Sequence, residues 1–247
     1  MSLSRFHLPA SDWDSLALTD DEAQHCGRVL RKAPGDRIEV FDGAGRVAIA
    51  IITAITKSKV QVRLESEHRH EPLAHAIHLL PAMIKAEPFE WLLEKAVELG
   101  AASVQPIITD HTIVHLVGDN LEKKLAKWRR HMVESAKQCH TPFIPVLEAP
   151  RSFATLIPAL PSEAVKILPA LSEHSRSLDR AVGHQRTAYI AIGPEGDFTS
   201  AEEAFAQQHG FVPVTLGPLI LRAETAAITA LAVLSHELRR AGASKSA

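Results

Sequence analysis

The sequence has few cysteines, no long hydrophobic run and almost no excess of either charge, and each scarcity excludes a class of protein. Its 247 residues include 2 cysteines, Cys26 and Cys139. This number excludes a disulfide framework and indicates a reducing, cytoplasmic environment. The uncharged stretch near the C-terminus, residues 225–234, is much shorter than the ~20 apolar residues that span a membrane. Residues 1–9 contain no apolar core segment, so we expect no secretory signal.

The balance of charge limits the kinds of partner that we expect for the protein. Lys and Arg total 27, Asp and Glu total 29, and the net charge is −2. A chain that bound nucleic acid with its whole surface would be strongly basic. Any nucleic-acid contact must therefore be confined to a local patch. The 46% hydrophobic content is that of a globular protein, and the length fits one or two domains.

The first region of the chain is rich in strand patterns. Residues 36–42, 46–56 and 59–65 alternate between apolar and polar side chains, and Asp42-Gly43 with Gly45 provides a turn between the first two. This pattern predicts a small antiparallel barrel or sandwich. A short helix is expected over residues 20–30. The polar stretch 66–75 is the expected linker.

The pattern after the linker alternates strands and helices. A strand over residues 76–83, a helix over 88–99 and a strand over 103–109 form a crossover unit, which predicts a parallel sheet. Further strands are expected at 143–147, 165–171, 187–192 and 211–216, with a helix between the last two and a terminal helix at 225–240. A long helix is expected at 120–139. The helix at 88–99 has a predicted buried face formed by Phe89, Leu92, Leu93, Ala96 and Val97.

The strand at 187–192 ends abruptly in Gly193-Pro194-Glu195-Gly196. Thr199, three residues before Glu202, is typical of a capping box, so a helix follows the loop. Glycine at both ends lets the backbone approach a ligand at the carboxyl end of a parallel strand. Taken alone, the motif also fits a tight strand-to-helix turn.

A second loop has a similar arrangement. The strand at 211–216 ends in Leu216-Gly217, and Arg222, Glu224 and Thr225 come just before the terminal helix. Arg222 and Glu224 alone can be explained as a capping pair, because a carboxylate is favoured at the positive end of a helix.

Together the two loops resemble those of the RsmE-type ribosomal RNA uridine-N3 methyltransferases of the SPOUT superfamily, which carry a GPEG loop and an LG-x-x-ILR-x-ETA segment. The order and spacing of the two segments match. The resemblance also includes Val29-Leu30-Arg31, Phe41-Asp42-Gly43, the stretch at 95–100, and Glu134 with Gln138. It extends over nearly the whole chain.

The resemblance implies an α/β protein with two domains. Residues 1–70 would form a PUA-like RNA-binding β-barrel, and residues 74–247 a SPOUT methyltransferase domain with a parallel sheet and a deep trefoil knot around 190–230. It further implies a homodimer, S-adenosylmethionine as cofactor, no metal, and 16S ribosomal RNA or the small ribosomal subunit as partner. The knot loops would hold the cofactor through Leu171, Ile192, Gly193, Pro194, Glu195, Gly196, Leu216, Gly217, Ile220, Leu221, Arg222, Thr225 and Ala226.

The implied chemistry requires no metal. The N3 position of uracil is a poor nucleophile until its proton is removed or the developing charge on O2 or O4 is stabilised. Arg222 suits the second task through paired hydrogen bonds from its guanidinium. Glu224 or Glu195 are candidates to assist proton removal. The alternative for Arg222 is a structural pair with Glu224 or across the dimer.

A target base inside folded RNA must be turned out of its stack, so cationic side chains are needed to grip the flanking phosphates. The candidates for contact with the substrate are Arg5, Arg28, Arg31, Lys32, Lys85, Lys95 and Gln138. Surface Lys and Arg also serve solubility alone.

Several positions depart from the family pattern. Asp197 replaces a common glycine, and His111 stands where an arginine often follows the strand that ends at Thr109. Lys137, His140 and Thr141 interrupt an EQ-x-x-R pattern. These departures bear on substrate grip more than on cofactor binding, so a different target nucleotide is an open alternative.

Three functions therefore compete. The first is S-adenosylmethionine-dependent methylation of N3 of a uridine in small-subunit ribosomal RNA. The second keeps the knot but moves the methyl group to another base atom or to the ribose 2′-hydroxyl. The third is a ribosome-assembly factor without catalysis. The histidines at 68, 70, 75 and 78 invite a metal site, but they lack the spacing of known zinc motifs, and a solvated linker is the preferred interpretation.

Overall fold

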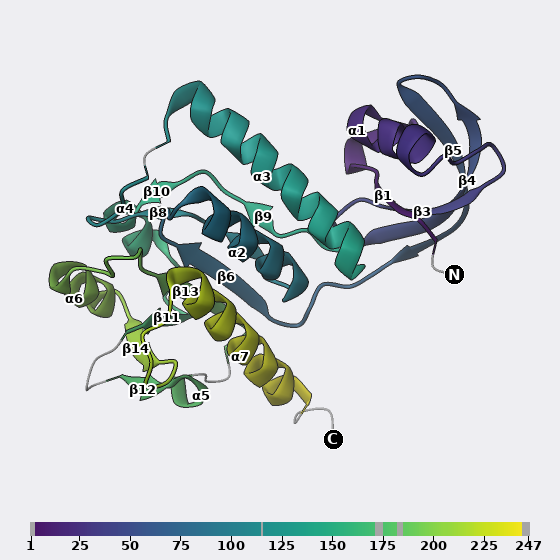
Figure 1. Ribbon diagram of the computed structural model, residues 1–247. Helices are drawn as coiled ribbons and strands as arrows, with labels where there is room; N and C mark the ends of the chain where they lie inside the picture. The colour runs from purple at the N-terminus through teal and green to yellow at the C-terminus, as the bar shows by residue number, and fades with distance from the viewer. Residues whose placement is uncertain (1–2, 115, 171–174, 182–184, 244–247) are drawn as a thin grey trace. The chain divides into compact units, whose positions relative to one another are not determined.

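The computed structural model (Figure 1) describes the chain except for residues 1–2, 115, 171–174, 182–184 and 244–247. Its contacts divide the chain into two compact units: Met1–Pro72 with Val133–Ile144, and Leu73–Met132 with Pro145–Ala247. The first unit thus takes in a short segment from the middle of the chain. None of the helices in the described ranges combines the length and hydropathy that a bilayer crossing requires.

Among the described residues, the first unit contains a five-stranded sheet in the order β1-β3-β4-β5-β2. Its strands are β1 (Arg5–His7), β2 (Ala17–Thr19), β3 (Arg37–Phe41), β4 (Arg46–Ile55) and β5 (Lys59–Arg69). The pairs β3–β4 and β4–β5 are antiparallel, as the alternating pattern predicted. β5 also pairs antiparallel with β2, a strand that the pattern did not predict. The β1 strand, which the pattern did not predict, pairs with β3 in parallel.

Two expectations for this unit need correction. Residues 66–69, expected in the linker, instead continue β5. Arg69 pairs with Arg46 of β4, and the guanidinium of Arg46 lies 2.6 Å from Glu67. The expected helix at 20–30 is shorter and changes form: α1 (Asp20–Gln24) is followed by a π-helical turn, η2 (His25–Val29). A 3-10 turn, η1 (Ala10–Asp12), precedes β2. The core under the sheet includes Phe6, Ile38, Val40 and Ile52.

The second unit is built on a seven-stranded sheet among its described residues, in the order β12-β14-β11-β13-β6-β7-β9. All its neighbouring strands pair in parallel, which confirms the predicted sheet. The strands are β6 (Ala76–Pro81), β7 (Ser103–Val104), β9 (Val146–Leu147), β11 (Val165–Pro169), β12 (Arg176–Ser177), β13 (Thr187–Ile192) and β14 (Phe211–Thr215).

The strand expected over 103–109 is divided in two. After β7, the chain passes Pro106 and forms β8 (Ile107–Ile108), which leaves the main sheet and pairs with β10 (Arg151–Ser152). Proline has no N–H to donate to a ladder, so it interrupts a central strand. The strand expected at 143–147 likewise shrinks to β9, and the one at 165–171 ends at Pro169 within the described residues.

The helices of the second unit cover the sheet. They are α2 (Ala86–Glu98), α3 (Gly118–Cys139, whose last turns belong to the first unit), α4 (Phe153–Leu156), α5 (Leu178–Ala181), α6 (Ser200–Gln208) and α7 (Ala223–Ala243), with a 3-10 turn, η3 (Ile157–Ala159). The five predicted apolar residues of α2 are its buried residues. Each such burial contributes about 1.5–3 kcal/mol for the larger side chains. Helix α2 packs beside α7 (Figure 1), and Phe89 contacts Trp128 of α3.

Candidate functional site

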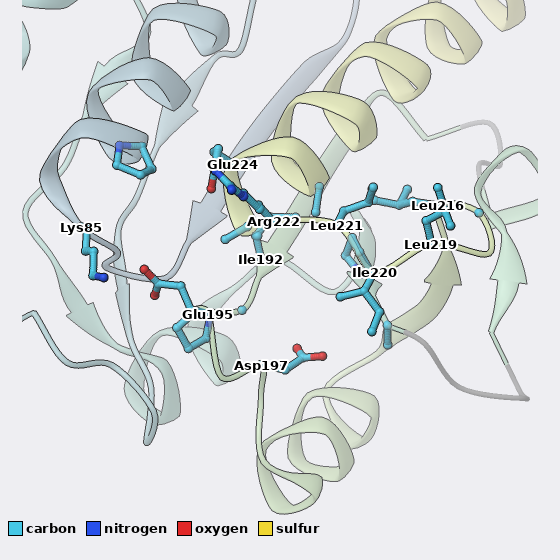
Figure 2. A pocket seen from close by; sticks show the side chains of 18 residues that line it. Lys85, Ile192, Glu195, Asp197, Leu216, Leu219, Ile220, Leu221, Arg222 and Glu224 are labelled. Atoms are coloured by element: carbon cyan, nitrogen blue, oxygen red, sulfur yellow. The ribbon is translucent and has the colours of Figure 1, made fainter.

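A cavity of about 520 Å³ opens at the carboxyl ends of four neighbouring strands of the parallel sheet, β14, β11, β13 and β6. Open α/β sheets bind ligands at this edge. The loops that follow the four strands and the first turns of α2 and α7 supply the lining (Figure 2). It consists of Lys85, Pro88, Pro169, Ala170, Ile192, Gly193, Pro194, Glu195, Asp197, Leu216, Gly217, Leu219, Ile220, Leu221, Arg222, Ala223, Glu224 and Ala226.

The loop after β13 is held in a fixed shape by its own hydrogen bonds. The Asp197 N–H donates to the Pro194 carbonyl at 3.0 Å, and the Asp197 side chain accepts from the Phe198 N–H at 2.8 Å. Asp197 has a left-handed backbone, with φ of 59°, which Asp tolerates better than most residues. A side chain at Gly193 would crowd the loop, since a Cβ there would lie 2.8 Å from Asp197 Oδ1 and 3.2 Å from the Phe198 backbone nitrogen.

The helix that follows this loop begins as predicted. Thr199 accepts from the Glu202 N–H at 3.2 Å, and the Glu202 carboxylate accepts from the Thr199 N–H at 2.9 Å. The pair forms the expected capping box of α6. It satisfies two backbone donors at the helix start and so fixes the point where the loop ends.

The loop after β14 has less support from the rest of the protein. The Thr215 hydroxyl bonds to both the N–H and the carbonyl of Gly217, each at 3.1 Å. Gly217 has φ of 124°, which a residue with a side chain adopts only under strain. Beyond this turn, the side chains of Leu219 and Ile220 are 72% and 86% exposed. An apolar surface is thus presented at the rim of the cavity.

Charged side chains stand around this apolar slot. Glu195, Arg222 and Glu224, the three predicted catalytic residues, all line the cavity. Glu224 is buried in the first turn of α7, where the helix dipole favours a carboxylate. Lys85 precedes α2, and Figure 2 shows its side chain directed toward Glu195. With Asp197, which also belongs to the lining, the cavity joins apolar walls to three carboxylates and two cations.

The structure brings most of the predicted cofactor residues to this one cavity. Those that line it are Ile192, Gly193, Pro194, Glu195, Leu216, Gly217, Ile220, Leu221, Arg222 and Ala226. Of the described residues in the predicted set, Gly196 and Thr225 are not part of the lining, and Leu171 lies outside the described residues.

Sequence reasoning missed several lining residues, which are Pro88, Pro169, Ala170, Leu219 and Ala223. Pro169 and Ala170 end β11, and the position of that strand next to β13 could have identified them. In the sequence, Asp197 is recognisable only as a departure from the family pattern.

The predicted substrate residues occupy different settings. Lys85 lines the cavity, whereas Arg28, Arg31 and Gln138 are exposed and Lys32 half-buried in the first unit. Arg5 is buried. Its guanidinium donates to the Thr141 carbonyl at 2.9 Å, lies 3.3 Å from Glu39 and stacks over Phe41. This set of contacts turns Arg5 toward the protein interior.

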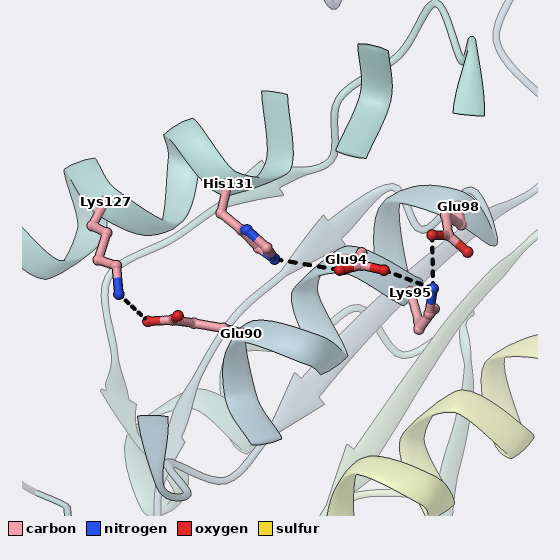
Figure 3. A network of polar contacts seen from close by, with 6 residues as sticks. All are labelled: Glu90, Glu94, Lys95, Glu98, Lys127 and His131. Carbon is pink, nitrogen blue, oxygen red and sulfur yellow. Dashed lines mark hydrogen bonds and ion pairs between the residues drawn. The ribbon is translucent and has the colours of Figure 1, made fainter. Parts of the chain in front are cut away.

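Lys95 belongs to a network of ion pairs on the surface of α2 (Figure 3). Its Nζ lies 2.7 Å from Glu94 and 2.8 Å from Glu98, and these hydrogen bonds raise the pKa of Lys95. One turn away, Glu90 bonds to Lys127 at 2.8 Å, which links α2 to α3 and lowers the pKa of Glu90. Two carboxylates beside Lys95 already balance its charge.

The residues that interrupt the family's EQ-x-x-R pattern make contacts of their own. Lys137 is buried and its Nζ lies 2.8 Å from Glu22 and 2.9 Å from Glu134. Burial is the largest effect on Lys137 and opposes its charge, but the hydrogen bonds that Lys137 donates to Glu22 and Glu134, with the charges of these carboxylates, outweigh it and raise the pKa of Lys137. His140 lies 3.8 Å from Glu39. These positions thus support the first unit internally.

The histidines and cysteines are candidates for metal ligands. In the part of the chain that the structure describes, no three side chains of His, Cys, Asp or Glu gather as metal ligands. In the first unit, the rings of His68 and His70 meet edge to face at 4.5 Å. Both cysteines are free thiols, and burial raises the pKa of Cys26 to about 11.

The site has the architecture of an RNA methyltransferase domain, whose family model matches residues 70–235; a second model, the RNA methyltransferase PUA domain, matches residues 18–65. The chain belongs to the family of the ribosomal RNA small subunit methyltransferase E proteins. A member from Synechocystis is 31% identical over 90% of this chain and 73% of its own length.

Solved structures show the same fold over almost the entire chain. A methyltransferase from Legionella pneumophila, solved in complex with its cofactor SAM, has a TM-score of 0.87 and 31% identity, covering 96% of this chain and 98% of that one. The ribosomal RNA small subunit methyltransferase E from Neisseria gonorrhoeae, bound to S-adenosyl methionine, has a TM-score of 0.84 and 29% identity, covering 95% and 97%.

Proposed function

We propose that this protein transfers a methyl group from S-adenosylmethionine to N3 of a uridine in 16S ribosomal RNA. The observation that carries the proposal is the convergence of the two predicted loops, after β13 and β14, on one cavity. Family membership and the solved relatives with bound S-adenosylmethionine support the same conclusion.

The cavity fits such a cofactor in size and chemistry. Its volume of about 520 Å³ falls within the roughly 300–1,000 Å³ of sites for small molecules. Ile192, Leu216 and Leu221 offer apolar walls for the adenine ring, and the glycines at 193 and 217 leave the backbone open to polar contact. We propose that the predicted cofactor residues, including Leu171, Gly196 and Thr225, hold the cofactor, and that the lining residues Pro169, Ala170 and Leu219 join them.

When bound, S-adenosylmethionine supplies an electrophilic methyl group. The remaining task for the protein is to orient uracil N3 toward that group and to manage its proton. Glu224 and Glu195 line the cavity, and either carboxylate would accept the N3 proton; the third carboxylate of the lining, Asp197, already accepts a hydrogen bond from the Phe198 N–H. Glu224 is the more buried of the two glutamates, so its charge is less screened by water.

Arg222 is the residue we assign to charge stabilisation. As N3 loses its proton, negative charge develops on O2 and O4 of the base. A guanidinium can hold these oxygens with paired, charge-assisted hydrogen bonds. Arg222 lines the cavity and is exposed to an incoming base. Lys85, at the same cavity, would contact the phosphate that flanks the target nucleotide.

The first unit would bind the surrounding RNA. We propose that Arg28, Arg31 and Lys32 contact phosphates, with Gln138 as a polar contact. Arg5 and Lys95 already form ion pairs with Glu39 and Glu94 within the protein, so we propose that they position these side chains and do not bind RNA directly. We further propose a PUA-like domain at 1–70, a methyltransferase domain at 74–247 with a trefoil knot around 190–230, a homodimer, and a cytoplasmic location.

Two measurements test the function. A calorimetric titration with S-adenosylmethionine should show saturable binding to the wild-type protein. Small ribosomal subunits from a strain that lacks the methyltransferase should then gain 3-methyluridine when incubated with protein and cofactor, as detected by nucleoside mass spectrometry.

The possible outcomes separate the competing functions. A methyl group found on another base atom or on a ribose would replace the N3 assignment but keep the cofactor site. Binding to subunits with no binding of S-adenosylmethionine would instead identify an assembly factor. Analytical ultracentrifugation tests the dimer, and a sharp monomer mass would refute it.

A further inference from the structure

The turn that follows β8 has an unusually well-defined shape. The Thr109 N–H donates to Thr112 Oγ1 at 2.9 Å, the two hydroxyls share a hydrogen bond of 2.9 Å, and the Thr112 N–H donates to the Thr109 carbonyl at 3.1 Å. Both threonines are buried. The turn therefore presents Asp110 and His111 at its exposed tip from a fixed base.

The tip of this turn contacts the loop after β13. His111 Nδ1 lies 2.9 Å from the Gly196 carbonyl and 2.9 Å from the Asp197 carbonyl. A carbonyl oxygen only accepts, so Nδ1 must carry a proton and donate to both. Beside it, the Asp110 N–H donates to Glu202 Oε1 at 2.9 Å. The turn thus contacts the loop at Gly196 and Asp197 and contacts α6, the helix that follows the loop, at Glu202.

The close approach of His111 depends on glycine in the loop. A Cβ on Gly196 would lie 3.3 Å from His111 Cβ and 3.4 Å from its Cγ. Gly196 itself does not line the cavity, whereas its neighbours Glu195 and Asp197 do. His111, which is not part of the lining, therefore bonds to the loop at Gly196, also outside the lining, and at Asp197, which belongs to it.

We propose that His111 is a positioning residue that fixes the loop 193–197 in the shape that binds S-adenosylmethionine. The role rests on the proposed function, because it assumes that this loop holds that cofactor. His111 is not among the lining residues, so it acts through the carbonyls of Gly196 and Asp197. Without the hydrogen bonds from His111, the loop would adopt several conformations. Binding of S-adenosylmethionine would then have to order the loop, which would reduce the affinity.

The chain offers matched variants for a test. His111→Ala removes the donor. His111→Asn restores it, since the Asn amide nitrogen can reach the place of Nδ1. His209→Ala is the control, because His209 Nδ1 also donates to a backbone carbonyl, that of Phe205 at 2.8 Å, away from the cavity. Thermal melts of every variant establish that each one is folded.

Two readouts are measured on the full-length protein. Hydrogen exchange of the peptide that spans 193–202, without cofactor, should become faster in His111→Ala and remain at the wild-type rate in His111→Asn and His209→Ala. The dissociation constant of S-adenosylmethionine, by calorimetry, should rise about tenfold in His111→Ala and stay within twofold in the other two. At saturating cofactor, kcat should stay within threefold of wild type in all three.

The outcomes distinguish this role from the proposed function. Wild-type affinity in His111→Ala would refute the role of His111, even if the loop exchanged faster, and so would equal losses in His111→Ala and His111→Asn. A fall in kcat with unchanged affinity would overturn it in favour of a contact with the substrate. If the wild-type protein itself bound no S-adenosylmethionine, the proposed function would fail, and the role of His111 toward that cofactor would fail with it.

Discussion

The two loops that form the cavity differ in how they are held. The loop after β13 is fixed at several points, by Asp197, by the capping box of α6 and by His111. The loop after β14 has a glycine turn at one end, and then exposes Leu219 and Ile220 almost fully. The first loop thus forms a rigid wall of the cavity. The apolar side chains of the second loop become buried only when a ligand or another protein surface covers them. The contrast supports the proposal that the first loop recognises the cofactor and that the second loop, which carries Arg222 and leads into Glu224, adapts to the ligand and contributes to the chemistry.

The largest expected effect concerns the chemistry of the second loop. Arg222→Ala should lower kcat by about 100- to 1,000-fold, since loss of one group that stabilises developing charge typically costs that much. The cofactor affinity should change by less than fivefold. Methylation kinetics and calorimetry give the two numbers. Turnover near the wild-type rate would show that Arg222 only caps α7 or pairs with another residue.

The next effect tests the rigidity of the first loop. Gly193→Ala places a Cβ 2.8 Å from Asp197 Oδ1 and 3.2 Å from the Phe198 backbone nitrogen, so the Asp197 side chain or the loop backbone must shift, and the bond from the Phe198 N–H to Asp197 is disturbed. We expect at least tenfold weaker binding of S-adenosylmethionine, which corresponds to about 1.4 kcal/mol. Calorimetry measures it.

Gly217→Ala serves as the comparison for Gly193→Ala, because no atom lies within 4 Å of its Cβ position. Its cost comes from backbone strain alone, about 1–3 kcal/mol at a conformation that favours glycine. A lower melting temperature for Gly217→Ala would show the cost of backbone strain. A loss of affinity for S-adenosylmethionine in Gly193→Ala would show the cost of crowding in the loop. Wild-type affinity in Gly193→Ala would contradict the picture of a rigid wall.

A smaller effect is expected at the exposed rim. The double change of Leu219 and Ile220 to Ser should alter the free energy of unfolding of the isolated chain by less than about 0.5 kcal/mol, as for other exposed positions. If the rim is covered by bound cofactor or by a second copy of the chain, the cofactor affinity or the dimer mass should fall. Calorimetry and sedimentation separate these two outcomes, and no change in either would remove the adaptive role of this loop.

The smallest effect is a pH dependence from His111. Its hydrogen bond to the Asp197 carbonyl, the largest cause, and that to Gly196, with Glu202 and Asp110 nearby, raise its pKa. A raised folded pKa means that protonated His111 stabilises the loop fully below the ordinary value of about 6.5. That stabilisation is lost as the pH rises through the raised pKa. The peptide 193–202 should therefore be less protected at pH 8 than at pH 6, after correction for intrinsic exchange, and His111→Asn should abolish the difference.

Much of this architecture follows from residue patterns. The buried face of α2, the bounds of β13 and the capping box at Thr199 and Glu202 follow from local periodicity and local hydrogen bonds. The two cavity loops were predicted because each combines glycine with the end of an apolar strand. Their convergence was implied by the family resemblance, since β13 and β14 are separated in the sheet by β11.

The rest depended on contacts between distant parts of the chain. No local pattern indicates that the parallel partner of β3 is β1, or that β8 leaves the main sheet for β10. In the sequence, His111 is recognisable only as the replacement of an arginine, because its two carbonyl partners are more than eighty positions away. Burial of Arg5 and Lys137 similarly reflects partners such as Glu39 and Glu22, which spacing alone does not pair.

The strand order of the second unit has a consequence for synthesis. β6 is made first, yet it lies in the sheet between β7 and β13, and β13 begins only at Thr187. As the chain emerges from the ribosome, the edge of β6 that pairs with β13 stays unpaired until most of the protein has been translated. Non-local parallel pairing of this kind is slow and exposes hydrophobic edges. The nascent chain should accordingly depend on chaperones, and a version truncated before β13 should aggregate.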